Sequence, residues 1–258
     1  MKIVSMGAGN VATHLSKALF DAGNEICQIY SRSEESASVL SVKLGCPYTT
    51  NVKDVCDDAD IYVFAVKDDA LATVIKQVKT NNGIWIHTAG SIPDNVFYGF
   101  AKNYGVMYPL QTFSKNRKPD FSKVPLFIEG NSQETENTLS SVARTISDNV
   151  SVINSEKRKY LHLAAVFACN FTNNMYDIAA QILDEQGIDS RLLLPLIDET
   201  ADKLHHLTPA KAQTGPAVRN DTKTMDSHLV MLQNNEIRKI YKIISRNIRY
   251  FFIQNKQL

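Results

Sequence analysis

Gly7, Gly9 and Ala12 have the residue types and the spacing that bind a pyrophosphate. They form the pattern GxGxxA directly after an apolar run at residues 3–6, and a helical stretch follows. In this context the first glycine makes a tight turn, the second lets the backbone approach the phosphates, and the small alanine lets the helix pack on the strand. The helix N-terminus then offers free N–H groups to the anion. The pattern predicts a dinucleotide contact through Gly7, Gly9, Asn10 and Val11, with an ordinary glycine turn as the alternative.

The end of the second expected strand indicates which dinucleotide is bound. It reads Tyr30-Ser31-Arg32-Ser33, with no carboxylate where an NAD enzyme binds the ribose 2′-hydroxyl. Hydroxyls beside a guanidinium suit a 2′-phosphate, so Ser31, Arg32 and Ser33 predict NADP over NAD. The alternative is that Arg32 starts the next helix in solvent and Ser33 caps it.

The ends of later strands should line the same crevice, because ligands of open α/β sheets bind at the carboxyl ends of the strands. These ends predict further cofactor contacts at Ala65, Val66, Lys67 and Thr88, and substrate contacts at Gly90 and Gln111. Asp68 or Asp69 could flank the cofactor or only cap a helix.

His162 and Asn170 are the candidate catalytic residues of the second half. On an ideal α-helix His162 and Cys169 share a face, and Asn170 lies about 80° round from His162. Asn170, Asn174 and Asp177 form a polar stripe on an otherwise apolar helix. Such a stripe is paired or lines a cavity, so Asn170 could hold a substrate oxygen while His162 transfers a proton. An interdomain hydrogen-bond network or a dimer contact is the alternative.

A loop before the last expected helix adds substrate candidates. Arg219 could clamp a carboxylate or a phosphate, and Asp221 could orient Arg219 or cap the following helix. A structural salt bridge between the two is equally open. The adjacent His205 and His206 point about 100° apart on a helix, so no metal site is expected. The substrate candidates here are Thr214, Arg219, Asp221 and His228.

Strand and helix signals alternate over the first 150 or so residues, which predicts a doubly wound, mainly parallel α/β sheet. From residue 154 onward the sequence pattern is that of helices, which are expected over 156–186, 190–207 and 222–255, with a polar loop at 208–221. We therefore expect a Rossmann domain at 1–153 and an all-helical domain at 154–258. The strands are expected at residues 3–6, 25–30, 61–66, 84–87, 106–108, 125–129 and 150–153.

Composition excludes several classes of partner. The 258 residues are 44% hydrophobic and 21% charged, with a net charge of +1, so neither nucleic acid nor a membrane surface is expected. There is no run long enough to span a membrane, and we expect no signal peptide. Four scattered cysteines indicate free thiols in a reducing compartment, so we expect a cytoplasmic protein.

Several motifs together resemble a known family. GAGNVA, YSRS and FAVKDDAL are similar to the 6-phosphogluconate dehydrogenase-like superfamily, which includes pyrroline-carboxylate reductase and deazaflavin-dependent NADP reductase. HTAGS, YPLQTF, HLAAVFACNF and TGPAVRND narrow the resemblance to Rossmann-like oxidoreductases with a C-terminal helical domain of unknown function. The resemblance implies an NADP cofactor, a homodimer that buries the helical domains against each other, and a small-molecule substrate between the two domains.

Two positions depart from the family pattern. Tyr108 stands where the family often has histidine, and Val166 stands where hydroxyacid dehydrogenases have a lysine four residues before Asn170. The expected function is hydride transfer between NADP(H) and a carbonyl or imine carbon of a small polar, anionic substrate. Because of the departures, a non-catalytic NADP sensor is the main alternative, and a deazaflavin as hydride partner is a second.

Overall fold

The computed structural model describes residues 1–255, which form two compact units. The first unit runs from Met1 to Cys169, and the second begins at Asn170. No helix in the described part of the chain is long and apolar enough to cross a membrane.

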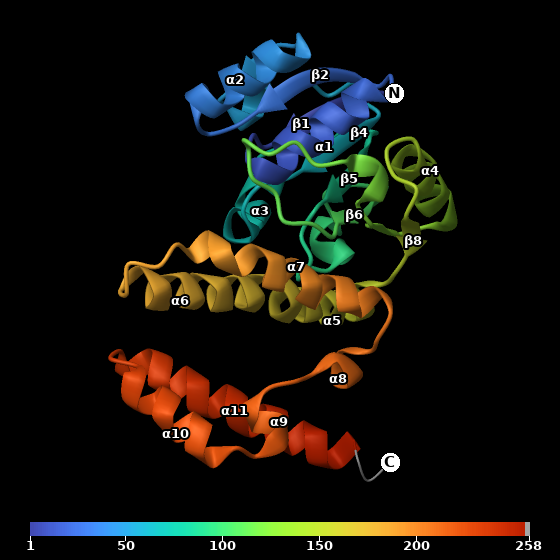
Figure 1. Cartoon of the computed structure of the whole chain (residues 1–258). Helices are drawn as coiled ribbons and strands as arrows, with labels where there is room; N and C mark the ends of the chain where they lie inside the picture. The colour runs from blue at the N-terminus through green and yellow to red at the C-terminus, as the bar shows by residue number, and fades with distance from the viewer. Residues whose placement is uncertain (256–258) are drawn as a thin grey trace. The chain divides into compact units, whose positions relative to one another are not determined.

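One eight-stranded sheet forms the first unit, in the order β3-β2-β1-β4-β5-β6-β7-β8 (Figure 1). All neighbouring strands are parallel except β6 and β7. The expected doubly wound, mainly parallel sheet is confirmed. The strands are β1 Lys2–Met6, β2 Glu25–Tyr30, β3 Tyr48–Thr49, β4 Ile61–Phe64, β5 Ile84–His87, β6 Tyr104–Pro109, β7 Leu126–Gly130 and β8 Val150–Val152.

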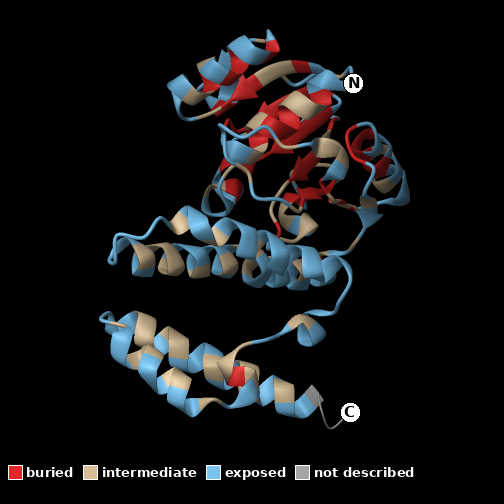
Figure 2. Ribbon diagram, viewed as in Figure 1, coloured by how far each residue is buried: buried red, intermediate tan, exposed pale blue. Residues whose placement is uncertain are grey.

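The central strands are apolar because helices cover both faces of the sheet. All four residues of β4 are buried, and the buried residues concentrate in the sheet and the helix faces against it (Figure 2). On one face Phe64, Trp85 and Phe97 form an aromatic cluster, with the Phe64 centroid 5.2 Å from each of the other two. This core fixes where the strands end, and with them the loops that carry the candidate site.

The helices of the first unit differ in how they begin, and three of them have a side-chain cap. Ser33 caps α2 by accepting from the Ser36 N–H at 3.3 Å, and Gly45 ends that helix with a φ of 66°. Ser132 and Asn154 cap the later helices in the same way. These helices are α1 Asn10–Asp21, α2 Glu34–Leu44, α3 Asp68–Ile75, α4 Gln133–Arg144 and α5 Ser155–Ala165, with short 3₁₀ turns at Val52–Asp54, Asp94–Phe97 and Phe121–Lys123.

The second unit is helical, and its described residues contain no strand. The helix expected over 222–255 is wrong as one element, because Leu232 is extended and Asn234 starts a new helix by accepting from the Glu236 N–H at 2.8 Å. The expected loop at 208–221 contains two short helices that begin with proline. The helices are α6 Thr172–Asp184, α7 Leu194–Asp202, α8 Pro209–Ala212, α9 Pro216–Arg219, α10 Thr222–Met231 and α11 Asn235–Asn255, with 3₁₀ turns at Ser190–Leu193 and Lys203–His205.

A π-helical segment at Val166–Phe171 interrupts the helix expected over 156–186. A π-helix bonds i to i+5 and therefore has more residues per turn than an α-helix. The ideal angles used to relate His162 to Cys169 and Asn170 are consequently wrong. Segments of this kind occur frequently at functional sites.

Two features bear on the domain boundary expected after residue 153. Secondary structure changes type there, since β8 ends at Val152 and α5 begins at Ser155. The contacts, however, place α5 in the first compact unit, which extends to Cys169. The division into domains at 1–153 and 154–258 therefore stays a proposal. In that proposal α5 belongs to the helical domain by sequence, although it lies in the same compact unit as the sheet.

Candidate active site

The turn between β1 and α1 requires glycine at its first position. Gly7 has a φ of +134°, and a Cβ atom there would lie 2.4 Å from the backbone oxygen of Ala65. Its N–H donates to the Tyr30 oxygen at 2.7 Å, which ties the turn to the end of β2. The turn thus packs closely between the ends of β2 and β4, as a dinucleotide-binding turn does.

The start of α1 is open to an anion. Its N-cap is Gly9, which offers no side chain, and there is no acidic residue in the first turn. The first amide groups of a helix lack partners within the helix, so they are available to a phosphate. By contrast, α3 starts with Asp68 and Asp69 in its first turn.

A cavity of about 710 Å³ opens along the carboxyl ends of β1, β2, β4, β5 and β6. The structure brings every predicted cofactor residue to its lining, together with His162, Gly90 and Gln111. Ser36, Tyr108 and Lys115 also line it and were not predicted as site residues. The predicted cofactor residues are Gly7, Gly9, Asn10, Val11, Ser31, Arg32, Ser33, Ala65, Val66, Lys67 and Thr88.

Hydroxyl and cationic groups gather where β2 meets α2. Ser33 caps α2, as its alternative interpretation held, and the Ser31 hydroxyl accepts from the Ser33 N–H at 3.2 Å. Lys115 Nζ donates to the Ser36 hydroxyl at 3.4 Å. Arg32 is exposed and forms no ion pair within residues 1–255. Two cations beside serine hydroxyls suit a phosphate monoester.

Lys115 lies in a loop far from Arg32 in sequence, so no local motif indicated it. Tyr108, in contrast, could have been identified from the sequence, because it occupies the position where the family that this chain resembles often has histidine.

Tyr108 and His162 meet at the part of the cavity that β5 and β6 line. The Tyr108 hydroxyl lies 2.9 Å from His162 Nδ1, and the two rings are edge to face at 5.9 Å. Gly90 leaves room for the imidazole, because a Cβ atom there would be 2.6 Å from His162 Cγ. Tyr108 is buried, and burial raises the pKa of its hydroxyl. The Tyr108 hydroxyl therefore stays protonated and lies within hydrogen-bond distance of the imidazole.

A buried ion pair holds the helix that carries His162. Arg158 in α5 is fully buried and pairs with Glu129 of β7. Glu129 also accepts from the Ser155 N–H and the Ser155 hydroxyl, each at 2.7 Å. The Arg158 guanidinium further donates to the Ile92 oxygen. These bonds fix the start of α5 to the sheet and orient His162 indirectly.

His87, at the end of β5, is fully buried and neutral. Its Nδ1 accepts from the Ala89 N–H at 3.1 Å, and its Nε2 lies 3.3 Å from the Pro93 oxygen. Burial, with the nearby positive charge of Arg158, lowers the pKa of His87 to about 4. His87 therefore holds the backbone that follows β5 and does not itself line the cavity.

Five predicted site residues lie in the second unit, and two of them have observed partners. Asp221 caps α10 by accepting from the Thr224 N–H at 3.1 Å and from its hydroxyl at 2.7 Å. These bonds lower the pKa of Asp221. His228 Nδ1 lies 2.8 Å from the Tyr241 hydroxyl. The capping role of Asp221 is thus observed, whereas a substrate role for Asn170, Thr214, Arg219, Asp221 and His228 stays a prediction.

No group of three or more His, Cys, Asp or Glu side chains that could hold a metal ion occurs within residues 1–255. All four cysteines are free thiols.

Comparisons with known proteins agree with this geometry. Residues 2–88 match the family described as NADP oxidoreductase, coenzyme F420-dependent, and residues 124–248 match a domain of unknown function, DUF2520. A candidate NADP oxidoreductase from Bacteroides fragilis is 46% identical, with a TM-score of 0.91 over 96% of this chain and 98% of that one. The 1-pyrroline-5-carboxylate reductase from Streptococcus pyogenes shares the fold at 17% identity, with a TM-score of 0.65 over 97% and 98% of the two chains.

A shorter match links the chain to the glycerol-3-phosphate dehydrogenase [NAD(P)+] of Bacillus subtilis. The two are 31% identical over an alignment of 111 residues that covers 37% of this chain. The matched segment spans only 32% of the length of that relative.

The fold and the cavity define a Rossmann-type oxidoreductase of the NADP class. The chain belongs to the family of NADP oxidoreductases that carry the DUF2520 domain after the Rossmann domain, the family of the Bacteroides fragilis protein. The resemblance stated from the sequence motifs is confirmed.

Proposed function

We propose that this protein transfers a hydride between NADP(H) and a carbonyl or imine carbon of a small polar, anionic substrate. One observation carries the proposal: a single cavity is lined by the whole predicted cofactor set and, where β5 and β6 end, by the hydrogen-bonded pair Tyr108 and His162. Cofactor contacts and a proton-holding pair in one cavity are the two requirements of such a reaction.

The residues of the cavity fit NADP from end to end. The open N-terminus of α1 and the close turn at Gly7 suit the pyrophosphate, and Ser31, Arg32 and Ser33 suit the 2′-phosphate. Thr88 follows β5, which lies on the other side of β4 from β1, so it suits the nicotinamide half. When bound, the nicotinamide accepts or supplies the hydride.

His162 holds the proton that accompanies the hydride. In the direction of reduction, His162 delivers a proton to the substrate oxygen or nitrogen, and in oxidation it removes that proton. The Tyr108 hydroxyl fixes the imidazole through Nδ1 and is thus a positioning residue. Arg158 and Glu129 hold the start of the same helix.

Substrate residues were predicted in each of the two units. Gly90 and Gln111 line the cavity of the first unit. We further propose Asn170 as a catalytic contact that holds a substrate oxygen. Thr214, Arg219, Asp221 and His228 complete the proposed substrate set, in which the guanidinium of Arg219 suits an anionic group.

We also propose that the chain acts as a cytoplasmic homodimer through its helical part. The support for the dimer is the set of large apolar side chains exposed on helices of the second unit, since contiguous exposed apolar surface marks an interaction site. These include Leu196, Val230, Met231, Ile243 and Phe251.

The direct test is turnover of NADPH by the purified protein with a panel of small oxo acids, each with and without ammonium. The proposal expects loss of NADPH absorbance with at least one member. NADPH consumption that requires an oxidised deazaflavin, and occurs with no oxo acid or imine, would contradict the substrate class. Tight NADPH binding with no turnover by any partner would support the sensor alternative and overturn the enzyme assignment.

A further inference from the structure

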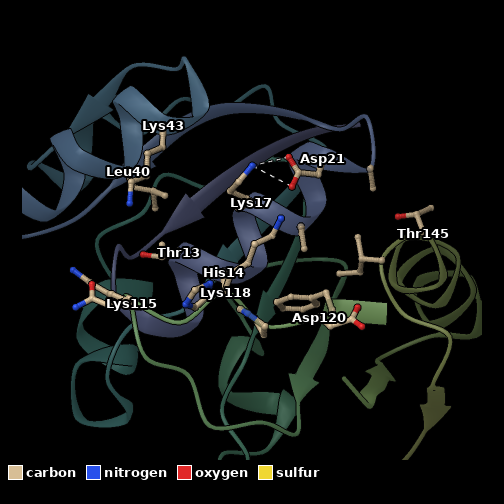
Figure 3. Close-up of a pocket in the computed structure, with 16 residues that line it drawn as sticks. Thr13, His14, Lys17, Asp21, Leu40, Lys43, Lys115, Lys118, Asp120 and Thr145 are labelled. Carbon is tan, nitrogen blue, oxygen red and sulfur yellow. Dashed lines mark hydrogen bonds and ion pairs between the residues drawn. The ribbon is translucent and has the colours of Figure 1, made fainter. Parts of the chain in front are cut away.

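A second cavity, of about 590 Å³, lies in the first unit and has no part in the proposed reaction. Its lining comes from α1, the second half of α2, the loop 115–121 and the end of α4 (Figure 3). Lys115 is the one residue that lines both this cavity and the cofactor cavity among the described residues.

Four lysines line this cavity, and most of them lack an acidic partner. Lys17 pairs with Asp21 at 2.8 Å, which Figure 3 shows as dashed lines. Lys43, Lys115 and Lys118 form no ion pair within residues 1–255. Ammonium groups around one cavity repel each other, so an anion in the cavity is stabilised by all of them.

The other carboxylate of the lining does not neutralise these lysines. Asp120 accepts from the Ser122 hydroxyl at 2.6 Å and pairs with Lys123 at 3.3 Å, and Lys123 is not part of the lining. These two partners lower the pKa of the Asp120 carboxyl. The cavity therefore keeps a net positive charge at neutral pH.

The cavity also has an apolar wall, made by Leu40, Phe121 and Ile146. Phe121 stacks on Phe113 at 5.8 Å, and Phe113 stacks on His14 at 5.7 Å. An apolar wall beside three lysines that form no ion pair suits a ligand that has both an apolar body and a concentrated negative charge.

Hydrogen bonds from α1 fix the loop that closes the cavity. Asn10 Nδ2 donates to the Phe113 oxygen at 2.8 Å, and His14 Nε2 lies 2.9 Å from the Ser114 oxygen. Asn10 lines the cofactor cavity, whereas His14 lines the second one. The same helix thus contributes to both cavities.

We propose that this cavity binds a small organic phosphate with an apolar body, and that the bound phosphate weakens the binding of NADPH. The weakening follows because Lys115 serves both sites: a phosphate that engages Lys115 withdraws it from Ser36 and from the 2′-phosphate of the cofactor. The weakening of NADPH binding rests on the proposed function. Coupling between two ligands is reciprocal, so NADPH also weakens the organic phosphate.

Phenyl phosphate is the probe, titrated by calorimetry into the protein without nucleotide. It should bind at least about tenfold more tightly than inorganic phosphate or phenol, because only phenyl phosphate has both the charge and the apolar ring. Equal affinity for phenyl phosphate and inorganic phosphate would overturn the proposed ligand class.

Variants locate the binding. Lys43→Glu and Lys118→Glu should each weaken phenyl phosphate about tenfold or more while leaving NADPH binding unchanged, since neither residue lines the cofactor cavity. Lys53→Glu, at an exposed lysine outside both cavities, is the matched control. Thermal melts confirm that all three fold. If Lys53→Glu weakens phenyl phosphate as much as Lys43→Glu does, the site is wrong.

A final arm tests the coupling. With saturating phenyl phosphate, wild-type protein should bind NADPH about threefold or more weakly and NADH unchanged, because only NADPH carries the 2′-phosphate. Unchanged NADPH affinity would overturn the coupling. If NADPH fails to bind at all, the proposed function fails, whereas calorimetry with phenyl phosphate still decides the second cavity.

Discussion

At the scale of single residues, the proposed acid–base role depends on the contact between Tyr108 and His162. The hydroxyl and Nδ1 are 2.9 Å apart, and Tyr108 is buried. A hydrogen bond to one ring nitrogen sets which tautomer the imidazole adopts and leaves the other nitrogen for proton transfer. The pair therefore has the geometry that positioned acid–base catalysis needs.

Removal of the phenolic hydroxyl tests this role. We expect Tyr108→Phe to lower kcat about tenfold and to shift the pH profile of kcat, because His162 loses its Nδ1 partner, while the Kd of NADPH stays within about twofold. His162→Gln should lower kcat about 100-fold or more. Steady-state kinetics across pH give both values.

Tyr98→Phe is the control, since Tyr98 is 78% exposed and lies outside the cavity. An unchanged pH profile in Tyr108→Phe, with kcat equal to that of Tyr98→Phe, would contradict the positioning role.

His87 predicts how stability depends on pH. Its pKa falls from an ordinary value of 6.5 to about 4 in the folded protein, so the unfolded chain binds a proton that the folded protein excludes. The stabilisation is therefore complete above about pH 6.5 and is lost as the pH falls toward about 4. We expect this residue to contribute a slope of up to about 1.4 kcal/mol per pH unit in that window.

Urea unfolding at a series of pH values, on wild type and His87→Gln, measures this slope. Carboxylates elsewhere titrate alike in both proteins, so the difference isolates His87. Identical slopes would show that the imidazole is not held neutral.

At the scale of elements, the turn from β1 to α1 carries the cofactor argument. Gly7→Ala should destabilise the fold by about 1–3 kcal/mol or more, because φ is +134° and the added Cβ meets the Ala65 oxygen at 2.4 Å. A Cβ atom at Gly9 would have no other atom within 4 Å, so Gly9→Ala should fold within about 0.5 kcal/mol of wild type.

Although Gly9→Ala should have little effect on folding, it should have a clear effect on NADPH binding. In the proposed binding mode the pyrophosphate approaches the backbone at Gly9, so the methyl of Gly9→Ala should weaken NADPH binding about tenfold in a fully folded protein. Chemical denaturation and nucleotide fluorescence measure the two effects. A Gly9→Ala protein with wild-type NADPH affinity would contradict the placement of the pyrophosphate.

Some elements could be predicted from sequence and others could not, for physical reasons. β4 is apolar throughout because both its faces are covered, and this pattern is unambiguous. β3 has only two residues, too few for a period-two signal. The π-helical segment at Val166–Phe171 has no simple compositional signature, and the break at Leu232 depends on backbone geometry that hydrophobic periodicity does not report.

At the scale of the whole molecule, the doubly wound, mainly parallel sheet and the cofactor rim could be predicted because consecutive β-α units have few topological solutions. Every predicted cofactor residue follows a strand, so topology alone brings these residues to one rim. Lys115 and the Arg158–Glu129 pair could not be predicted, because a loop and a helix start return to the sheet by tertiary packing. The antiparallel pairing of β7 with β6 was likewise invisible in the alternation of elements.

The exposed apolar residues of the second unit predict a dimer. Light scattering should give twice the chain mass of 28.8 kDa at micromolar concentration. Ile243 of α11 is 58% exposed, so Ile243→Glu should shift the protein toward monomer, whereas Lys242→Glu at its exposed neighbour should not. A monomeric wild type would contradict the proposed assembly.

Titration of the purified protein with NADPH and with NADH, followed by nucleotide fluorescence, decides whether the first unit is an NADP site. NADPH should bind more tightly, and Arg32→Ala should weaken NADPH about 10- to 100-fold, since a hydrogen bond to a charged group contributes about 1.5–3 kcal/mol. NADH should change less than about twofold, and Arg144→Ala, at an exposed arginine outside the cavity, should change neither. Failure of both nucleotides to bind at near-millimolar concentration, or equal loss of NADPH and NADH in Arg32→Ala, would contradict NADP as the cofactor of this cavity.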